Sequence, residues 1–137
     1  MKKAERFSEG LIVFLTGGLI YSMIEICFRG YTHWSMTLTG GACLLLMYRH
    51  YAANPNEGML GKCLYGCIVI TSFELLVGCV VNLLLGWDVW DYSSQPLNLF
   101  GQICVMFSAF WFLLSVPAAA LCEVFRLRFA ELKKMLL

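Results

Sequence analysis

Four long apolar stretches, separated by short polar segments, decide what this chain can fold into. They cover about residues 11–28, 34–50, 60–85 and 99–125. A helix needs about 20 apolar residues, with a range of about 17–25, to cross the hydrocarbon core of a bilayer. We therefore expect an all-α, polytopic membrane protein with four transmembrane helices in a single domain, residues 1–137. The second stretch is the shortest in purely apolar residues, and a shallow or re-entrant hairpin is the alternative there.

Composition supports the same class. Charged residues make up only 14% of the chain and hydrophobic residues 60%, whereas a soluble domain carries about 25% charged residues. This excludes a water-soluble globule, a disordered tail and a nucleic-acid binder, because too few charges remain to solvate the surface. The net charge of +1 gives no reason to expect a polyanionic partner.

Several chemistries have no motif in the sequence. The seven cysteines are an odd number without a CxxC pair, and there are only two histidines, so neither a disulfide framework nor a metal site is expected. A phosphate-binding Walker A sequence and a serine nucleophile elbow are also missing from the sequence. We expect no enzyme activity and no cofactor.

The basic residues predict the orientation in the membrane. Nine of the ten lysines and arginines fall on one side of the four stretches; they are Lys2, Lys3, Arg6, Arg49, Lys62, Arg126, Arg128, Lys133 and Lys134. Cytoplasmic loops carry such an excess of basic residues, so both termini are expected in the cytoplasm. The segment 123–137 alternates charged and apolar residues, as in a solvated helix end or a docking surface for a cytoplasmic partner.

The two halves of the chain resemble each other. Each has a glutamate-bearing stretch, with Glu25 or Glu74, then an outer segment containing tryptophan and serine, residues 32–36 or 90–93. A glycine-bearing stretch follows in both halves. Helix pairs repeated about an axis along the membrane normal are known in transporters. Duplication of a helix pair and chance similarity both remain open.

Three charged residues lie within or near the apolar stretches and need an explanation, because a charge at the centre of a span costs at least about 2.5 kcal/mol. Glu25 and Arg29 are four residues apart on one helix face, which favours an ion pair. Glu74 has no basic residue in its own stretch. It must be protonated, reach Arg29 or His33, or bind a cation; a helix-packing hydrogen bond is the alternative to a role in transport. With Asn82, these residues form our candidate intramembrane polar site.

A second group of candidate residues lies on the outer side. It contains His33, Trp34, Ser35, Trp90, Asp91, Tyr92, Ser93, Asn98 and Gln102. Aromatic rings settle at the membrane interface, but an aromatic belt alone does not require the polar residues beside them. These residues either cap the following helix or line the mouth of a polar cavity. For Asn82 and Gln102, hydrogen bonds between helices are the simpler interpretation.

These motifs resemble a known family. Glu25 and Arg29 are followed by Thr-His-Trp-Ser-Met at 32–36, and Glu74 and Asn82 by Trp-Asp-Tyr-Ser at 90–93 with Gly-Gln-Ile-Cys at 101–104. From about residue 17 to 111 the chain is similar to small bacterial membrane proteins, the putative ABC-transporter type IV (CmpB-like) permeases. The resemblance implies a multi-pass protein of the bacterial cell membrane that works with a separate ATPase subunit.

Together these features predict a membrane-embedded transport component with an intramembrane carboxylate site. A chain this small encloses little cavity alone, so we expect a homo-oligomer or a partner subunit in the lipid bilayer. One alternative is a self-sufficient small transporter or channel coupled to ions or protons. The other is a membrane scaffold or accessory protein that transports nothing.

Overall fold

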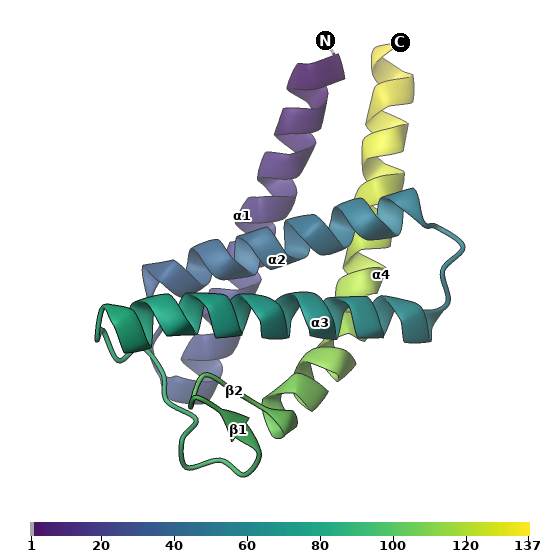
Figure 1. Cartoon of the computed structure of the whole chain (residues 1–137). Helices are drawn as coiled ribbons and strands as arrows, with labels where there is room; N and C mark the ends of the chain where they lie inside the picture. The colour runs from purple at the N-terminus through teal and green to yellow at the C-terminus, as the bar shows by residue number, and fades with distance from the viewer. Residues whose placement is uncertain (1) are drawn as a thin grey trace.

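The computed structural model describes residues 2–137, which form four helices and one short hairpin (Figure 1). The elements follow the apolar stretches; they are α1 (Lys2–Arg29), α2 (Trp34–Ala53), α3 (Met59–Gly78) with the π-helical turn η1 (Cys79–Leu84), β1 (Asn98–Leu99), β2 (Ile103–Cys104) and α4 (Val105–Leu136). The hairpin pairs Asn98 with Cys104 and Leu99 with Ile103 in antiparallel register. The all-helical architecture expected from the sequence is thus observed, apart from this hairpin.

Three helices are long and apolar enough to cross a membrane: Lys2–Arg29, Met59–Leu84 and Val105–Leu136. Helix α2 is not among them, so the described residues do not support a fourth span by length and composition. Its polar residues are accommodated by packing, because α2 contacts all three other helices. Residues such as Ser35 and Thr39 are buried inside the protein.

The last helix and the expected repeat both differ from the sequence-based prediction. Helix α4 begins at Val105 rather than near residue 99, and it continues through Pro117 to Leu136. The preceding residues form the hairpin because Gly101 adopts a left-handed backbone conformation, with φ of +70°. The internal repeat is not supported, since residues 30–33 link α1 to α2 whereas the much longer segment 85–104 links α3 to α4.

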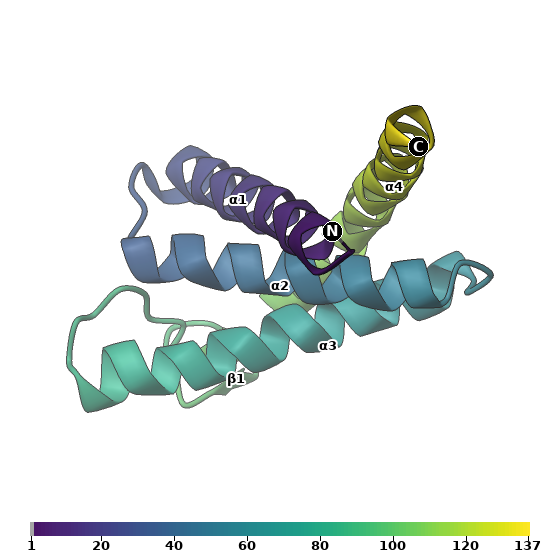
Figure 2. The same cartoon turned by 90° about the horizontal axis from the view of Figure 1, so that it is seen from above.

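Helix α1 packs mainly against α2 and helix α4 mainly against α3, and α2 also contacts α3 and α4. Helices α2 and α3 run side by side, and they cross α1 and α4 in the view of Figure 1; the view from above in Figure 2 also has α2 beside α3. The N-terminal part of α1 and the C-terminal part of α4 lie at the same end of the molecule. An ion pair between Lys133 Nζ and Glu9 Oε1, 2.6 Å apart, joins them there.

Glycines allow α1 and α2 to approach closely where they cross. A Cβ atom on Gly17 would lie 2.7 Å from the carbonyl oxygen of Gly40, and one on Gly41 would lie 2.7 Å from that of Phe14. Both distances are shorter than van der Waals contact, so only glycine fits. Small residues at such crossings let membrane helices pack backbone to backbone.

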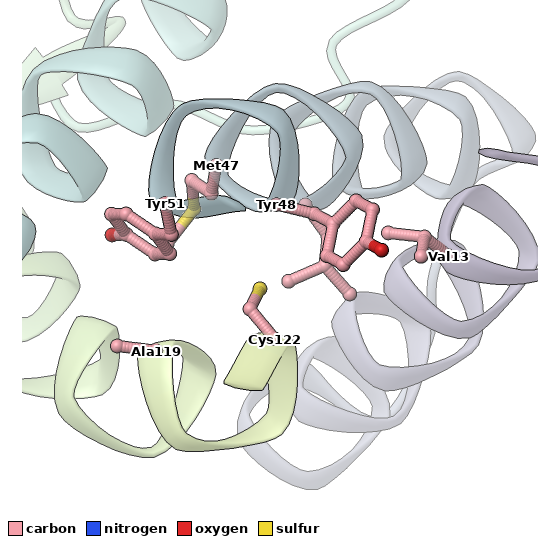
Figure 3. Close-up of a cluster of buried hydrophobic side chains, with 7 residues drawn as sticks. Val13, Met47, Tyr48, Tyr51, Ala119 and Cys122 are labelled. Carbon is pink, nitrogen blue, oxygen red and sulfur yellow. The ribbon is translucent and has the colours of Figure 1, made fainter. Parts of the chain in front are cut away.

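The buried side chains form two clusters. The first, drawn in Figure 3, joins α1, α2 and α4; it contains Val13, Leu44, Met47, Tyr48, Tyr51, Ala119 and Cys122. The second lies toward the other end and contains Tyr21, Met36, Val81, Val89, Trp90 and Trp111. The second cluster includes two side chains that bond the carboxylate of Glu74, so the candidate polar site lies within it.

Candidate functional site

Glu74 lies in α3 with only 2% of its surface exposed. Three neutral donors from three parts of the chain point at its carboxylate. The indole Nε1 of Trp111 in α4 donates to Oε2 over 3.0 Å, and the hydroxyls of Tyr21 in α1 and Tyr92 in the 85–104 loop donate to Oε1 over 3.3 and 3.5 Å. No cation among residues 2–137 forms an ion pair with Glu74, although buried carboxylates are usually paired with one.

This geometry can hold Glu74 in either protonation state. An indole N–H can only donate, so Oε2 accepts from Trp111 whether the carboxyl group is charged or neutral. A proton would therefore sit on Oε1, where the hydroxyls of Tyr21 and Tyr92 can turn from donors into acceptors. The site can gain or lose a proton without breaking its shortest hydrogen bond.

Glu25 and Arg29 form a separate ion pair on α1. Arg29 Nη2 lies 2.5 Å from Glu25 Oε2, and Arg29 Nη1 donates to the carbonyl oxygen of Val89 over 2.7 Å. Thr32 Oγ1 also donates to Glu25 Oε2 over 3.3 Å. Arg29 thus neutralises Glu25 and holds the 85–104 loop, and it makes no ion pair with Glu74.

Asn82 organises the 85–104 loop instead of joining the Glu74 network. Its Oδ1 accepts the backbone N–H of Val89 over 2.7 Å, and its Nδ2 donates to Gln102 Oε1 over 2.7 Å. The indole of Trp90 donates to the carbonyl oxygen of Gln102 over 3.0 Å. A Cβ on Gly78 would lie 2.6 Å from Gln102 Oε1, so this glycine leaves the space for the folded loop. The π-helical turn that carries Asn82 is the kind of helix defect often found at functional sites.

The folded loop carries Tyr92 to Glu74. The backbone N–H of Tyr92 donates to the carbonyl oxygen of Gly101 over 2.7 Å. Its ring stacks on Phe107 of α4, with ring centroids 4.7 Å apart. Both contacts direct the hydroxyl of Tyr92 inward, so Tyr92 links the outer loop to the buried carboxylate.

The outer residues of α2 act as a cap and an aromatic cluster. His33 Nδ1 accepts the backbone N–H of Ser35 over 3.2 Å and lies 2.6 Å from the Ser35 hydroxyl, which caps the first turn of α2. The rings of His33 and Trp34 lie 5.6 and 5.7 Å from that of Trp87. This aromatic cluster joins the 30–33 and 85–104 loops.

The remaining outer residues stabilise the loop itself. Hydrogen bonds from the side chain and backbone N–H of Ser93 hold the pKa of the Asp91 carboxyl below its usual value. Asn98 donates to the carbonyl oxygen of Gln95 over 2.8 Å and accepts from the N–H of Gly101 over 3.0 Å. Of the nine outer residues predicted to shape a mouth, only Tyr92 lines the cavity described next.

A cavity of about 410 Å³ lies between α1 and α4. It is lined by Tyr21, Ile24, Glu25, Phe28 and Arg29 of α1, by Tyr92 of the loop, and by Phe107, Phe110, Trp111, Leu113 and Leu114 of α4. All three donors to Glu74 belong to this wall, so the carboxylate lies directly behind it. A smaller apolar cavity of about 200 Å³ shares Tyr21, Ile24, Trp111 and Leu114 with the first.

Sequence reasoning missed Tyr21 and Trp111, the two α-helical partners of Glu74. Tyr21 precedes Glu25 and Arg29 by four and eight residues, so it lies on their helix face, and this spacing could have identified it. Trp111 carried a weaker signal: a buried indole N–H needs an acceptor. No group of three His, Cys, Asp or Glu side chains within residues 2–137 could hold a metal ion.

The fold and site define a class: a helical membrane protein with a buried carboxylate beside a half-open cavity between two helices. A family model described as putative ABC-transporter type IV matches residues 9–136, nearly the whole chain. The chain belongs to this family, which confirms the resemblance seen in the sequence and makes it a transport-related membrane component. No curated protein and no solved structure matches it.

Proposed function

We propose that this chain is the membrane subunit of a transporter and that the cavity between α1 and α4 receives the transported molecule. The observation that carries the proposal is the composition of the cavity wall. It contains the Glu25–Arg29 ion pair and all three donors to Glu74. A cavity of about 300–1,000 Å³ with mostly apolar walls and a few polar groups is typical of a small-molecule site.

The proposed topology has four crossings, with both termini on the cytoplasmic side of the cell membrane. The terminal parts of α1 and α4 lie at one end (Figure 1), and a chain with both ends on one side must cross an even number of times. Since α1, α3 and α4 are apolar enough to span, α2 is the fourth crossing. The excess of Lys and Arg toward the termini favours the cytoplasm for that end.

Glu74 is proposed to couple transport to protonation. Its carboxylate has neutral donors only, and its Oε1 faces two tyrosine hydroxyls that also line the cavity. When Glu74 gains or loses a proton, the electrostatic field in the adjacent cavity changes, and a low dielectric constant there strengthens the effect. This arrangement also suits the second candidate function, a self-sufficient transporter driven by a proton gradient.

The energy source separates these two candidates. The family description favours a separate ATPase subunit, and we propose such a partner for the cytoplasmic end. Transport by native membranes would then require ATP. Transport by the purified chain in liposomes, driven by a pH difference alone, would favour the self-sufficient transporter.

The experiment that tests the proposal blocks the cavity. Inside-out vesicles from cells expressing the chain are incubated with a metabolite extract and ATP, and their contents are compared by mass spectrometry. Ile24→Trp places a large ring in the cavity wall, whereas Met23→Trp places the same ring on the neighbouring exposed position, which is outside the wall. We expect accumulation of at least one compound to require the chain, to be lost in Ile24→Trp and to survive in Met23→Trp.

The scaffold alternative predicts a different result. If no compound depends on the chain, or if both tryptophan variants behave alike, the cavity does not receive a transported molecule. In that case the close α1–α2 crossing would be the functional feature, and substitutions at Gly40 or Gly41 would disrupt an assembly.

A further inference from the structure

We propose that the cavity between α1 and α4 takes a lipophilic organic cation, bound between its aromatic walls and the outward oxygen of Glu25. This inference rests on the proposed function and names the substrate class for the same cavity.

Glu25 has an oxygen that no other group uses. Both of its hydrogen-bond donors, Arg29 Nη2 and Thr32 Oγ1, reach Oε2. No donor among residues 2–137 bonds Oε1. The side chain is only 10% exposed, yet the residue lines the cavity. Because no buried side-chain oxygen lacks a hydrogen-bond partner among the described residues, Oε1 is the accessible oxygen of Glu25, and a cation inside the cavity could pair with it.

Arg29 is already held by its counter-ion, by a backbone carbonyl and by an aromatic ring. Its Nη2 bonds Glu25, its Nη1 bonds the carbonyl oxygen of Val89, and its guanidinium lies 4.9 Å from the ring centroid of Tyr31. An anionic ligand would meet a guanidinium whose charge is already paired with Glu25. The charges of Glu25 and Arg29 cancel, and Glu74 adds negative charge behind the wall whenever it is ionised. The cavity therefore favours a cation over an anion.

The rest of the wall suits the body of such a ligand. Six aromatic side chains line the cavity: Tyr21, Phe28, Tyr92, Phe107, Phe110 and Trp111. The faces of aromatic rings attract cations electrostatically. Aromatic and aliphatic surface also accepts the apolar substituents of a quaternary phosphonium or ammonium ion.

The test compares two ions of the same shape and opposite charge. Purified full-length protein in lipid nanodiscs is dialysed against radiolabelled tetraphenylphosphonium or tetraphenylborate, and empty nanodiscs correct for partition into lipid. We expect saturable binding of tetraphenylphosphonium and at least about tenfold weaker binding of tetraphenylborate, a difference of about 1.4 kcal/mol. This comparison uses the unmodified chain, so it does not depend on whether any variant folds.

The matched variants test the role of Glu25. Glu25→Gln should weaken tetraphenylphosphonium binding about tenfold and strengthen tetraphenylborate binding, because Arg29 loses its counter-ion. Glu123→Gln removes a carboxylate that also pairs with an arginine, Arg126, but lies outside the cavity, and should change neither affinity.

Equal binding of the two ions, preference for tetraphenylborate, or unchanged binding in Glu25→Gln would overturn the proposal. If Ile24→Trp still abolishes vesicle transport in that case, the cavity is a transport site for another class of molecule. If Ile24→Trp also leaves vesicle transport unchanged, the proposed function itself fails.

Discussion

At the scale of single residues, Glu74 depends on donors that come from distant parts of the sequence. Tyr21 is 53 residues away from it and Trp111 is 37 residues away. The sequence identifies Glu74 because a carboxylate in an apolar helix is costly. It does not identify the partners, because tyrosine and tryptophan are ordinary residues in membrane helices, and only the folded structure brings them together.

Removing the donor to Oε2 should destabilise the protein. Trp111→Phe keeps an aromatic ring but leaves a buried acceptor without its partner, which costs about 1–3 kcal/mol. Thermal unfolding of the detergent-solubilised protein should show a lower midpoint. Trp87→Phe serves as the control, because Trp87 is 45% exposed. Equal midpoints for the two variants would mean that the Trp111–Glu74 hydrogen bond contributes nothing.

Glu74→Gln removes the group that titrates but keeps a side chain that can make the same hydrogen bonds. The amide oxygen can still accept from Trp111, and the amide nitrogen can donate to a tyrosine hydroxyl, so the fold should survive. Vesicle transport should vary with pH in the unmodified chain and become independent of pH in the variant, because glutamine does not titrate. A variant that keeps the original pH profile would show that another group senses protons.

At the scale of elements, the apolar stretches located all four helices, although α4 starts later than predicted. The hairpin at residues 98–104 was missed because Leu99, Phe100, Ile103 and Cys104 extend the apolar pattern of the helix that follows. Its cause is local: Asn98 accepts the N–H of Gly101, and Gly101 turns the chain with a positive φ. For the candidate residues of the 85–104 loop, the sequence left a cap and a cavity mouth as alternatives; in the structure Asp91, Asn98 and Gln102 bond within the loop, and Tyr92 lines the cavity.

The α1–α2 crossing should tolerate no added side-chain atom. In Gly40→Ala the new methyl group would collide with the Cβ of Tyr21 and lie 3.0 Å from the carbonyl oxygen of Gly17. Overpacking of this kind typically costs about 1–3 kcal/mol. The unfolding midpoint should fall, and the yield of folded protein should fall with it.

Gly10→Ala is the matched control for that substitution. A Cβ on Gly10 would meet its nearest atom at 3.6 Å, and alanine in place of glycine favours a helix by up to about 1 kcal/mol. Its midpoint should stay the same or rise. If Gly40→Ala were as stable as Gly10→Ala, the helices would be free to separate and the close crossing would not be needed.

At the scale of the whole molecule, the chain places its charged groups in three settings. Basic residues gather toward the end that carries both termini, where Lys133 and Glu9 tie α4 to α1. The Glu25–Arg29 pair lies beneath the outer loop, and Glu74 lies alone among neutral donors. A subunit with this arrangement would bind a soluble partner at its basic end and a small molecule in the cavity. The distribution of Lys and Arg can be read from the sequence, whereas the cavity cannot, because its wall is assembled from α1, α4 and Tyr92 of the 85–104 loop.

The central claim is that the chain is the membrane subunit of a transporter, and its native assembly tests that claim most directly. The intact mass of the complex would be measured after extraction from native membranes in mild detergent. We predict this chain in stoichiometric complex with a companion that carries a nucleotide-binding domain. The chain alone, as a monomer or a homo-oligomer, would contradict the account and leave the proton-driven transporter or the scaffold in its place.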